Sequence, residues 1–368
     1  MNDDASFMRL ALALGRRGLG TTWPNPSVGA VVVEPGTGRI LGTGTTAPGG
    51  RPHGEPLALA AAGAAARGAT LYVTLEPCSH HGRTPPCTDA ILAAGIARVV
   101  SAVEDPDRRV AGRGHALLRA GGVAVETGLM GEIAARDHVG HITRVTRGRP
   151  AVHLKLARTR DGFCAGAGPE RLRITGPVAD GAVHLWRAHA DAILIGIGTA
   201  RADDPSLTVR LPGLGGRSPL RIVLDSHLML SPASVLARTA RDTPTLVLTT
   251  RSAPAHARRA LEALGVGIAI LPADVAGRVD LPTALAHLGE RGLTRLCSEG
   301  GPRLADALAR ADLIEACTLV TGPAELGPAG GLKAVGPDLG GALASERFRL
   351  AERLQLGPDE AATYERVV

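Results

Sequence analysis

Residues 53 to 87 bring together side chains that commonly bind zinc. His53 and Glu55 occur in HGE, Cys78 in EPC and Cys87 in PPC, and eight residues separate the two cysteines. Zinc prefers nitrogen and sulfur ligands, and three protein ligands leave the fourth tetrahedral position for water. Because His53 and Glu55 lie at a predicted helix start, both side chains can reach one metal centre. We therefore predict a zinc site formed by His53, Cys78 and Cys87.

This set of residues is typical of hydrolytic deamination. Zinc lowers the pKa of its bound water to about 7, and the resulting hydroxide can attack an amidine-like ring carbon. Glu55 is expected to carry the proton from the water to the ring nitrogen and then to the departing ammonia. The spacing of the cysteines is wider than the P-C-x-x-C signature of nucleic-acid deaminases. A closed structural zinc site, with His80 or His81 as fourth ligand, is the alternative, but it leaves Glu55 without a role.

Composition excludes several other classes of protein. The net charge is +6, but the arginines are scattered and aromatic residues make up 2% of the 368 residues, so surfaces for stacking bases are scarce. No apolar run approaches the roughly 18 residues of a membrane span. In a chain that has the composition of a cytosolic protein, five cysteines do not indicate a disulfide framework. Cys164, Cys297 and Cys317 are expected to be buried. We expect a cytoplasmic protein that binds neither nucleic acid nor membranes.

Strands and helices alternate in the first part of the chain. A helix is predicted over about 5–18, and a hairpin over PNPSVGAVVVE and GRILGTG. Further strands are predicted in ATLYVTL, ARVVSAV and VAVETGL, and helices in HGEPLALAAAGAAARG, PPCTDAILAAG and GRGHALLRAGG. This alternation predicts an α/β sandwich with a largely parallel sheet.

The pattern begins again after the polar linker TRGRP, which predicts domains at 1–147 and 148–368. Strands are predicted in AVHLKLA, DAILIGI, LRIVLD, TLVLTT, GIAILP, TRLCSE and EACTLVTG, and helices in PVADGAVHLWRAH, HARRALEALG, LPTALAHLGERG and GPRLADALARA. The strand TRLCSE leads into Gly300, Gly301 and Pro302 before a helix. Such a junction can bring backbone N–H groups to a phosphate, although it is also common in ordinary turns.

Motifs over nearly the whole chain resemble the bifunctional deaminase/reductase family of riboflavin biosynthesis. They are PNPSVGAVVVE, RPHGEPLAL, GATLYVTLEPCSHHGRTPPCTDAI, EDPDRRVAGRG, KLARTRDG, RITG, DAILIGIGTARADDPSLTVR, RIVLDS and EGGPRLADAL. The resemblance implies a cytidine-deaminase-like α/β/α sandwich followed by a dihydrofolate-reductase-like α/β domain. It also implies deamination of 2,5-diamino-6-ribosylamino-4(3H)-pyrimidinone 5′-phosphate, then reduction of its ribosyl group to ribityl by NADPH, in a homo-oligomer.

The resemblance also implies a role for individual residues. His53, Cys78 and Cys87 would bind zinc, and Glu55 would transfer protons. The residues implied for NADPH are Ala157, Arg173, Thr199, Asp203, Ser226, Gly301, Pro302, Arg303 and Leu304. Those implied for the phosphorylated pyrimidine are Asn25, Arg171, Arg187, Leu207, Arg210 and Glu299. Asp203 is also expected near the ribose carbonyl, whereas Asp204 and Asn25 could instead be turn residues.

Five positions depart from the family pattern. Gly54 replaces the usual alanine of HAE, and Thr46 stands where a substrate-binding histidine is common. Thr159 replaces a serine, Arg173 a tryptophan and Asp180 an arginine. Two alternatives therefore stay open: a relative that only deaminates or serves a secondary pathway, and a zinc-stabilised binding protein without catalysis. The retained Glu55 argues against the second.

Overall fold

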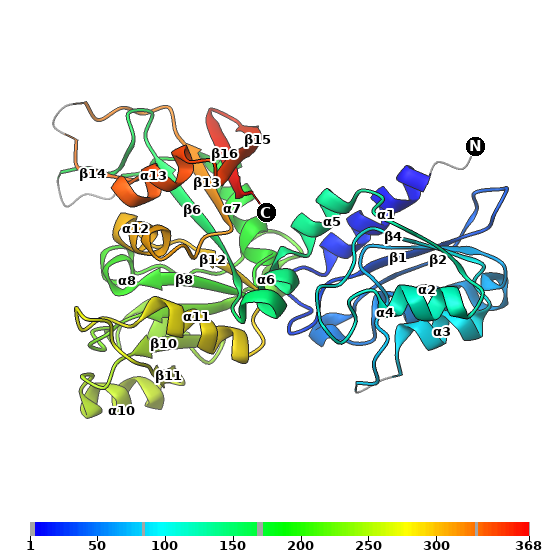
Figure 1. Ribbon diagram of the computed structural model, residues 1–368. Coiled ribbons are helices and arrows are strands. Elements are labelled where there is room, and N and C mark those ends of the chain that lie inside the picture. The colour runs from blue at the N-terminus through cyan, green and yellow to red at the C-terminus, as the bar shows by residue number, and fades with distance from the viewer. Residues whose placement is uncertain (1–3, 83–84, 168–171, 328–329, 368) are drawn as a thin grey trace. The chain divides into compact units, whose positions relative to one another are not determined.

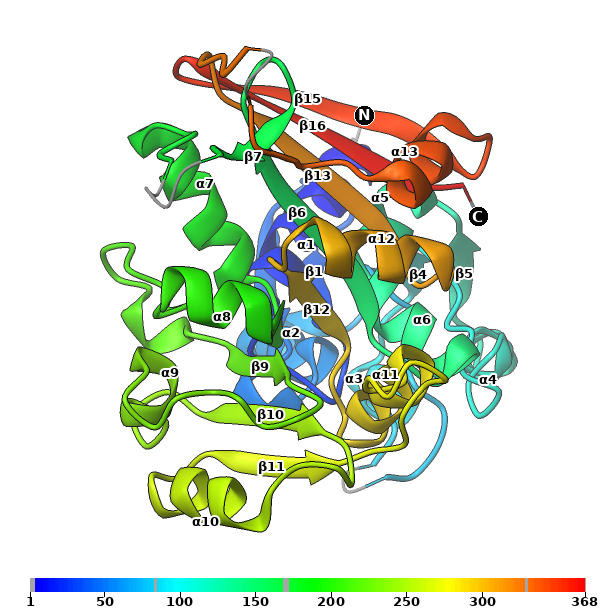
Figure 2. The ribbon, with the colours of Figure 1, turned by 90° about the vertical axis from the view of Figure 1, so that its left-hand side faces the viewer.

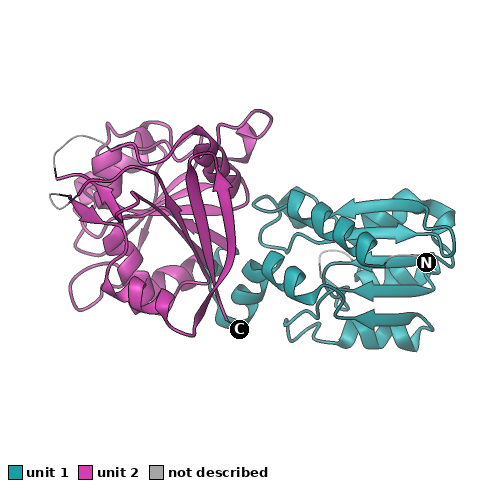
Figure 3. Cartoon of the chain, turned by 90° about the horizontal axis from the view of Figure 1, so that it is seen from above, with its two compact units in different colours: residues 1–150, 289–294 teal, residues 151–288, 295–368 magenta. Residues whose placement is uncertain are grey.

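The computed structural model describes residues 4–82, 85–167, 172–327 and 330–367. The chain forms two compact units (Figure 3). The first consists of Met1–Pro150 and Gly289–Thr294, and the second of Ala151–Leu288 and Arg295–Val368. Neither unit has a described helix with the length and apolar character needed to cross a membrane.

The first unit is built on a five-stranded sheet with the order β2-β1-β3-β4-β5. Its elements are α1 (Asp4–Arg17), β1 (Gly29–Val33), β2 (Ile40–Thr45), η1 (Pro48–Gly50), α2 (Gly54–Ala62), η2 (Gly63–Ala66), β3 (Thr70–Val73), α3 (Cys87–Ala94), β4 (Arg98–Ser101), α4 (Arg113–Ala120), β5 (Ala124–Thr127), α5 (Gly131–Asp137) and α6 (Val139–Arg147). Strand β1 pairs antiparallel with β2 and β3, whereas β3, β4 and β5 run parallel. The sheet is therefore mixed, and the prediction of a largely parallel sheet is wrong for this unit.

Helices cover both faces of this sheet (Figure 1). Successive residues of a strand point to opposite faces, so Val32 and Val31 belong to different cores. On the side of Val32, apolar residues of α2, α3 and α4 form one cluster with the strands. On the side of Val31, α1 and α5 contribute Met8 and Ala134 to the other. The result is the predicted α/β/α sandwich.

The second unit contains a nine-stranded sheet with the order β11-β10-β9-β8-β12-β6-β13-β16-β15 (Figure 2). Its elements are β6 (Ala151–Arg158), β7 (Phe163–Ala165), α7 (Pro177–Ala188), β8 (Ala192–Gly196), α8 (Ile197–Asp203), η3 (Gly215–Arg217), β9 (Leu220–Leu224), α9 (Val235–Arg238), β10 (Thr245–Thr249), α10 (Ala255–Ala263), β11 (Gly267–Ile270), α11 (Leu281–Glu290), β12 (Arg295–Ser298), α12 (Pro302–Arg310), β13 (Ala316–Thr321), β14 (Leu332–Lys333), α13 (Pro337–Ala344), β15 (Phe348–Leu356) and β16 (Asp359–Arg366). All neighbours from β11 to β13 pair in parallel.

Several elements of the chain were not predicted from the sequence: α5, α6, α8, α9, α13, β7, β14, β15 and β16. The hairpin of β15 and β16 adds two antiparallel strands to the edge of the second sheet. Helices α5 and α6 complete the first unit, and α6 includes Thr146 and Arg147 of the predicted linker. The helices and strands that were predicted in the second unit are all present, with ends shifted by one or two residues.

Candidate functional site

The three predicted zinc ligands come from three different parts of the first unit. His53 is the residue before α2, and Cys87 is the first residue of α3. Cys78 lies in the turn after β3, and its carbonyl accepts a hydrogen bond from Thr88 N at 3.2 Å. The segment before α2 fits closely against the sheet, because a Cβ atom at Gly54 would lie 2.5 Å from the Val28 carbonyl oxygen. An alanine at position 54 would therefore require the segment or the backbone at Val28 to shift.

The ligand atoms of these residues are placed as zinc requires. His53 Nδ1 lies 3.4 Å from Cys87 Sγ and 3.7 Å from Cys78 Sγ. With usual zinc bond lengths and tetrahedral angles, such nitrogen and sulfur atoms lie about 3.6 Å apart. Among the described residues, the group of ligand atoms within 4.8 Å of one another contains His53, Cys78 and Cys87 but neither His80 nor His81. The donor set therefore fits a zinc ion with an open position.

Hydrogen bonds at the cluster favour a thiolate. The thiol of Cys87 donates to Cys78, and this bond with that of His53 lowers the pKa of Cys78 to about 4. The backbone N–H of Cys87, at the start of α3, also donates to Cys78 Sγ at 3.3 Å. The same shared proton raises the pKa of Cys87, and the bond to Cys78 raises the pKa of His53. A metal ion in place of these protons would hold the same three atoms.

Glu55 is buried beside the cluster and is free to exchange a proton. Its side chain belongs to the first turn of α2, the residue is 2% exposed, and its Oε2 atom has no hydrogen-bond partner among the residues that the structure describes. Burial raises its pKa to about 7, against the opposing charge of His53. A carboxyl group with this pKa can both accept and return a proton near neutral pH.

Asn25 and Thr46 of the first unit form hydrogen bonds with the backbone of neighbouring segments. Asn25 Nδ2 donates to the Gly50 carbonyl at 2.8 Å, which ties the turn before β1 to the segment that leads to His53. Thr46 is buried, and its hydroxyl accepts a hydrogen bond from Val28 N at 3.0 Å. The side chain at position 46 is thus used inside the fold, where relatives often carry a histidine.

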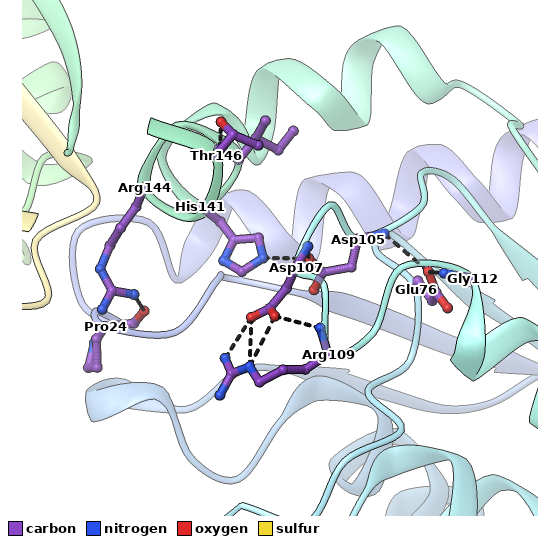
Figure 4. Close-up of polar contacts among 10 residues, drawn as sticks. Pro24, Glu76, Asp105, Asp107, Arg109, Gly112, His141, Arg144 and Thr146 are labelled. Carbon is purple, nitrogen blue, oxygen red and sulfur yellow. Dashed lines mark hydrogen bonds and ion pairs between the residues drawn. The ribbon is translucent and has the colours of Figure 1, made fainter. Parts of the chain in front are cut away.

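A network of acidic side chains on the loop after β4 was missed by the sequence analysis (Figure 4). Asp105 accepts from His141 Nε2 at 2.9 Å, and Asp107 binds the guanidinium of Arg109 with both oxygens. The hydrogen bonds and charge of Arg109 lower the pKa of Asp107 to about 2. Glu76 lies at the same loop. The sequence EDPDRRVAGRG marks the loop by its charge, but it does not show which backbone groups the carboxylates bind.

In the second unit, predicted cofactor residues meet at the start of α12. Gly301 is the residue before this helix and Pro302 is its first residue. Gly301 N donates to Thr199 Oγ1 of α8 at 3.1 Å, so two of the predicted residues are in direct contact. Arg303 and Leu304 follow in the first turn. The strand, glycine turn and helix are arranged as the sequence predicted, but Gly301 N is bonded to Thr199, Pro302 has no N–H and Leu304 N donates to the Gly301 carbonyl at 3.0 Å.

Arg187 and Glu299 form a bidentate ion pair that is largely, but not fully, shielded from water. Arg187 Nε and Nη2 lie 2.6 and 2.8 Å from the two carboxylate oxygens, and Nη1 donates to the Thr208 carbonyl. Burial acts to raise the pKa of Glu299, but the hydrogen bonds and charge of Arg187, with the charge of Lys155, hold it below its usual value. Arg187 is therefore committed to Glu299 and Thr208.

Lys155 was missed as a site residue. It lies on β6, which is paired with β12, the strand just before Glu299. The signal was available, because Lys155 and Lys333 are the two lysines of a chain with 41 basic residues. Both lysines lie in the second unit, and Lys333 Nζ donates to the Asp161 carbonyl and lies 3.6 Å from the centre of the Phe163 ring.

Arg173 and Asp180, two of the residues that depart from the family pattern, form an ion pair with each other. Arg173 Nη2 lies 3.3 Å from Asp180 Oδ2, and the two side chains are 72% and 50% exposed. The positive and negative replacements thus neutralise one another at the surface beside the start of α7. Arg171, predicted to bind substrate, lies outside the described residues.

The remaining predicted residues divide between exposed and packed positions. Asp203 is exposed at the end of α8. The pKa of the half-buried Cys164 is raised, mainly by burial and in addition by the negative charge of Asp203. Asp204 instead has a left-handed backbone (φ 37°) directly after α8, as expected of a turn residue, and its carboxylate accepts from Val235 N at 2.8 Å. Leu207 is 3% exposed and its side chain packs in the core, so only its backbone, at φ 52°, is offered to a ligand.

Three other predicted residues contact parts of the second unit other than the start of α12. Arg210 Nη1 donates to Ser206 Oγ at 2.9 Å. Ser226 Oγ accepts from Val279 N at 3.0 Å. Ala157 lies near the end of β6, half-buried and next to the central strand β13.

Comparisons with known proteins agree with both halves of this description. Residues 1–103 match the family described as cytidine and deoxycytidylate deaminase zinc-binding region, and residues 150–360 match the RibD C-terminal domain. The chain is 39% identical to the riboflavin biosynthesis protein RibD of Escherichia coli K12, over 97% of each chain. It is 41% identical to that of Aquifex aeolicus, over 82% of this chain and 81% of the relative.

Solved structures show the same likeness over the full length. An Acinetobacter baumannii RibD structure superimposes with a TM-score of 0.85 at 33% identity, covering 99% of both chains. The Thermotoga maritima diaminohydroxyphosphoribosylaminopyrimidine deaminase/5-amino-6-(5-phosphoribosylamino)uracil reductase gives a TM-score of 0.82 at 32% identity, again covering 99% of both chains.

Proposed function

Because this chain belongs to the RibD family of bifunctional riboflavin biosynthesis deaminase/reductases, we propose a role for each residue of its two sites. The protein is an enzyme with a zinc-binding deaminase and a reductase in one chain. We assign the deaminase to residues 1–147 and the reductase to residues 148–368. The substrate is proposed to be 2,5-diamino-6-ribosylamino-4(3H)-pyrimidinone 5′-phosphate, in line with the activity for which the Thermotoga maritima relative is named.

In the deaminase, His53, Cys78 and Cys87 would hold the zinc ion. A zinc ion bound there supplies a water molecule of lowered pKa. Glu55 would carry one proton from the attacking water to the pyrimidine ring nitrogen and a second, from the hydroxyl group thus added to the ring carbon, to the amino group, so that ammonia leaves and a carbonyl remains. Its buried position keeps bulk water from competing for the proton, and its pKa of about 7 suits transfer in both directions. Asn25 fixes the segment that leads to His53.

In the reductase, NADPH would bind at the start of α12. Gly301, Thr199 and the first turn of α12 receive a phosphate of the cofactor, and Ala157, Arg173 and Ser226 complete its site. Arg187 holds Glu299 in place, and Glu299 with Lys155 faces the ribosyl group. Asp203 is proposed to lie near the ribose carbonyl, while Arg171 and Arg210 approach the substrate phosphate because guanidinium groups suit phosphate.

One observation carries the deaminase assignment. Three zinc-ligand atoms stand at tetrahedral spacing, and a buried carboxylate oxygen of Glu55 beside them has no hydrogen-bond partner in the described part of the chain. A closed structural site has no use for such a carboxylate. The protein is further proposed to act on small molecules in the cytoplasm as a homo-oligomer, without nucleic-acid or membrane partners.

The test uses the purified zinc-loaded protein and the diaminopyrimidine ribosyl phosphate. Ammonia release is followed with and without NADPH, and NADPH oxidation is followed in the same tube. We expect ammonia in both cases and a matching loss of NADPH when it is present. Ammonia without NADPH loss would show a deaminase whose reductase is redirected or inactive. The absence of both signals would contradict the assignment to this substrate.

Glu55→Gln separates catalysis from a structural zinc site. We expect the variant to keep its zinc and fold, and to lose ammonia release by a factor on the order of 10² to 10⁴, because proton transfer is removed. Reduction of the deaminated product by NADPH should stay at the wild-type rate, which serves as the internal control. Wild-type ammonia release by a zinc-loaded Glu55→Gln protein would instead favour a non-catalytic metal site.

A further inference from the structure

Glu76 is a buried carboxylate whose two oxygens are both occupied by backbone N–H groups. It is 3% exposed and lies two residues before Cys78. Its oxygens accept from four backbone donors on the segment 105–115: Asp105 N at 3.2 Å, Gly112 N at 2.9 Å, Gly114 N at 2.9 Å and His115 N at 3.3 Å. A carboxylate has about four lone-pair sites, so this set fills them.

The same two segments touch at further points. Glu76 N donates to the Val103 carbonyl at 2.9 Å. A Cβ atom at Gly114 would lie 2.2 Å from the Pro77 carbonyl oxygen, so the start of α4 packs directly on the backbone before Cys78. The segment 103–115 therefore contacts residues 76 and 77 through backbone packing and hydrogen bonds, and most of these hydrogen bonds are accepted by the Glu76 carboxylate.

We propose that Glu76 is a positioning residue of the deaminase: it fixes the turn that carries Cys78 against the loop 104–115 and so sets the position of the Cys78 thiolate. This inference rests on the proposed role of Cys78 as a zinc ligand. Cys78 comes from a turn, whereas His53 and Cys87 stand at helix starts, so Cys78 is the ligand that needs outside support. Charge-assisted hydrogen bonds from four backbone N–H groups provide that support.

A second metal site is the competing explanation. Ligand atoms of Glu76, Glu104 and His115 lie within 4.8 Å of one another. However, four N–H groups already direct their positive ends at the Glu76 oxygens, and a cation would compete with them for the same lone pairs. Glu104 is also exposed to water. The contacts therefore favour an internal support for the turn over a cation site.

The experiment compares metal binding by Glu76→Gln and by a matched control, Glu104→Gln. The control makes the same change on the same loop, at an exposed carboxylate. In Glu76→Gln, the amide NH₂ faces N–H donors and cannot accept from them. We expect zinc affinity, measured by chelator competition, to fall roughly 10- to 100-fold, as happens when the groups that orient a metal ligand are removed. The cobalt-loaded variant should also show an altered thiolate-to-cobalt charge-transfer band, and Glu104→Gln should match wild type in both.

Thermal unfolding of each variant separates this role from a general loss of stability. A lower melting temperature with wild-type metal affinity and cobalt spectrum, measured below that temperature, would overturn the proposal. If Glu76→Gln does not fold, Glu76→Asp decides, because it retains the charge but is one methylene shorter. Weakened metal binding by Glu76→Asp supports the proposal, and wild-type binding overturns it. Zinc affinity is measured without substrate and does not depend on catalysis. If the wild-type protein released no ammonia, the proposed function would fail, but this test of Glu76 could still be carried out.

Discussion

At the scale of single residues, the pair of Arg187 and Glu299 shows how a functional side chain can be held by another. Their side chains are 12% and 11% exposed, and both nitrogens of one edge of the guanidinium are used. From the resemblance alone, each of the two residues is predicted to contact the substrate separately. The structure makes Arg187 the partner that keeps the Glu299 carboxylate ionised and oriented.

Removing one member of this pair should destabilise the second unit. We expect Glu299→Ala to lower the free energy of unfolding by about 3–5 kcal/mol, because the buried charge of Arg187 loses its partner. The measurement is urea unfolding followed by Trp186 fluorescence in a Trp23→Phe background. Asp180→Ala, which breaks the exposed pair with Arg173, is the control and should cost less than about 1 kcal/mol. Equal effects of the two changes would contradict the argument.

The candidate sites could be predicted only in part at this scale. The zinc ligands and Glu55 were predicted because side-chain chemistry alone identifies them. Glu76 was not, because its partners are backbone N–H groups, which no residue type marks. Lys155 was overlooked although a lone lysine among many arginines is itself a signal. The roles of Arg171, Ser226 and the other reductase residues stay predictions.

At the scale of secondary-structure elements, β6 lies inside the second sheet between β12 and β13. His153 of this strand is bonded through Nε2 to Thr318 Oγ1 of β13 at 2.7 Å and lies 6.4 Å, ring centre to ring centre, from Trp186. Burial, assisted by the charge of Arg295, lowers the pKa of His153 from 6.5 to about 4. The sheet is therefore built around a neutral imidazole.

This imidazole predicts a loss of stability in mild acid. Below pH 6.5 the unfolded chain takes up a proton at His153, while the folded chain does not until about pH 4. Between pH 7 and pH 5 the free energy of unfolding should therefore fall by about 2 kcal/mol on account of this residue. His153→Gln should show a correspondingly smaller fall in urea unfolding. The exposed His256→Gln should behave as wild type, and an unchanged pH dependence in His153→Gln would refute the prediction.

The elements that the sequence did not predict share a physical reason. Strand β15 reads FRLAERLQL, and most of its side chains are exposed, so it lacks the alternation of apolar and polar residues that marks a half-buried strand. The signal that remains is the turn at Gly357, whose φ is 67°. In the first unit, the antiparallel pairing of β1 with β3 depends on tertiary contacts, which a strand pattern does not reveal. Helices such as α12 were predicted because proline at the start and an apolar stripe are local signals.

At the scale of the whole molecule, the zinc-ligand residues and the predicted NADPH residues belong to different compact units. Each unit has its own sheet and its own apolar clusters. The named residues of each site therefore come from one unit.

Removal of the metal should for this reason separate the two activities. We expect a chelator to abolish ammonia release from the diaminopyrimidine while NADPH oxidation with the deaminated product continues, and added zinc to restore the first. The two assays are run on one preparation, with buffer exchange alone as control. Parallel loss of both activities on chelation would show that the reductase depends on the zinc site.

Because the chain has two lysines, it can be cleaved and labelled at very few positions. Lys155 follows the junction between the units at Pro150 and Ala151 by a few residues, and Lys333 lies late in the second unit. A protease specific for lysine would cut the denatured chain only after these two residues, and the first fragment would hold every proposed deaminase residue. Acylating reagents for side-chain amines would likewise label only the second unit. Mass spectrometry of labelled and digested protein would thus measure the fraction of Lys155 that is labelled with and without a ligand, and no activity assay is needed.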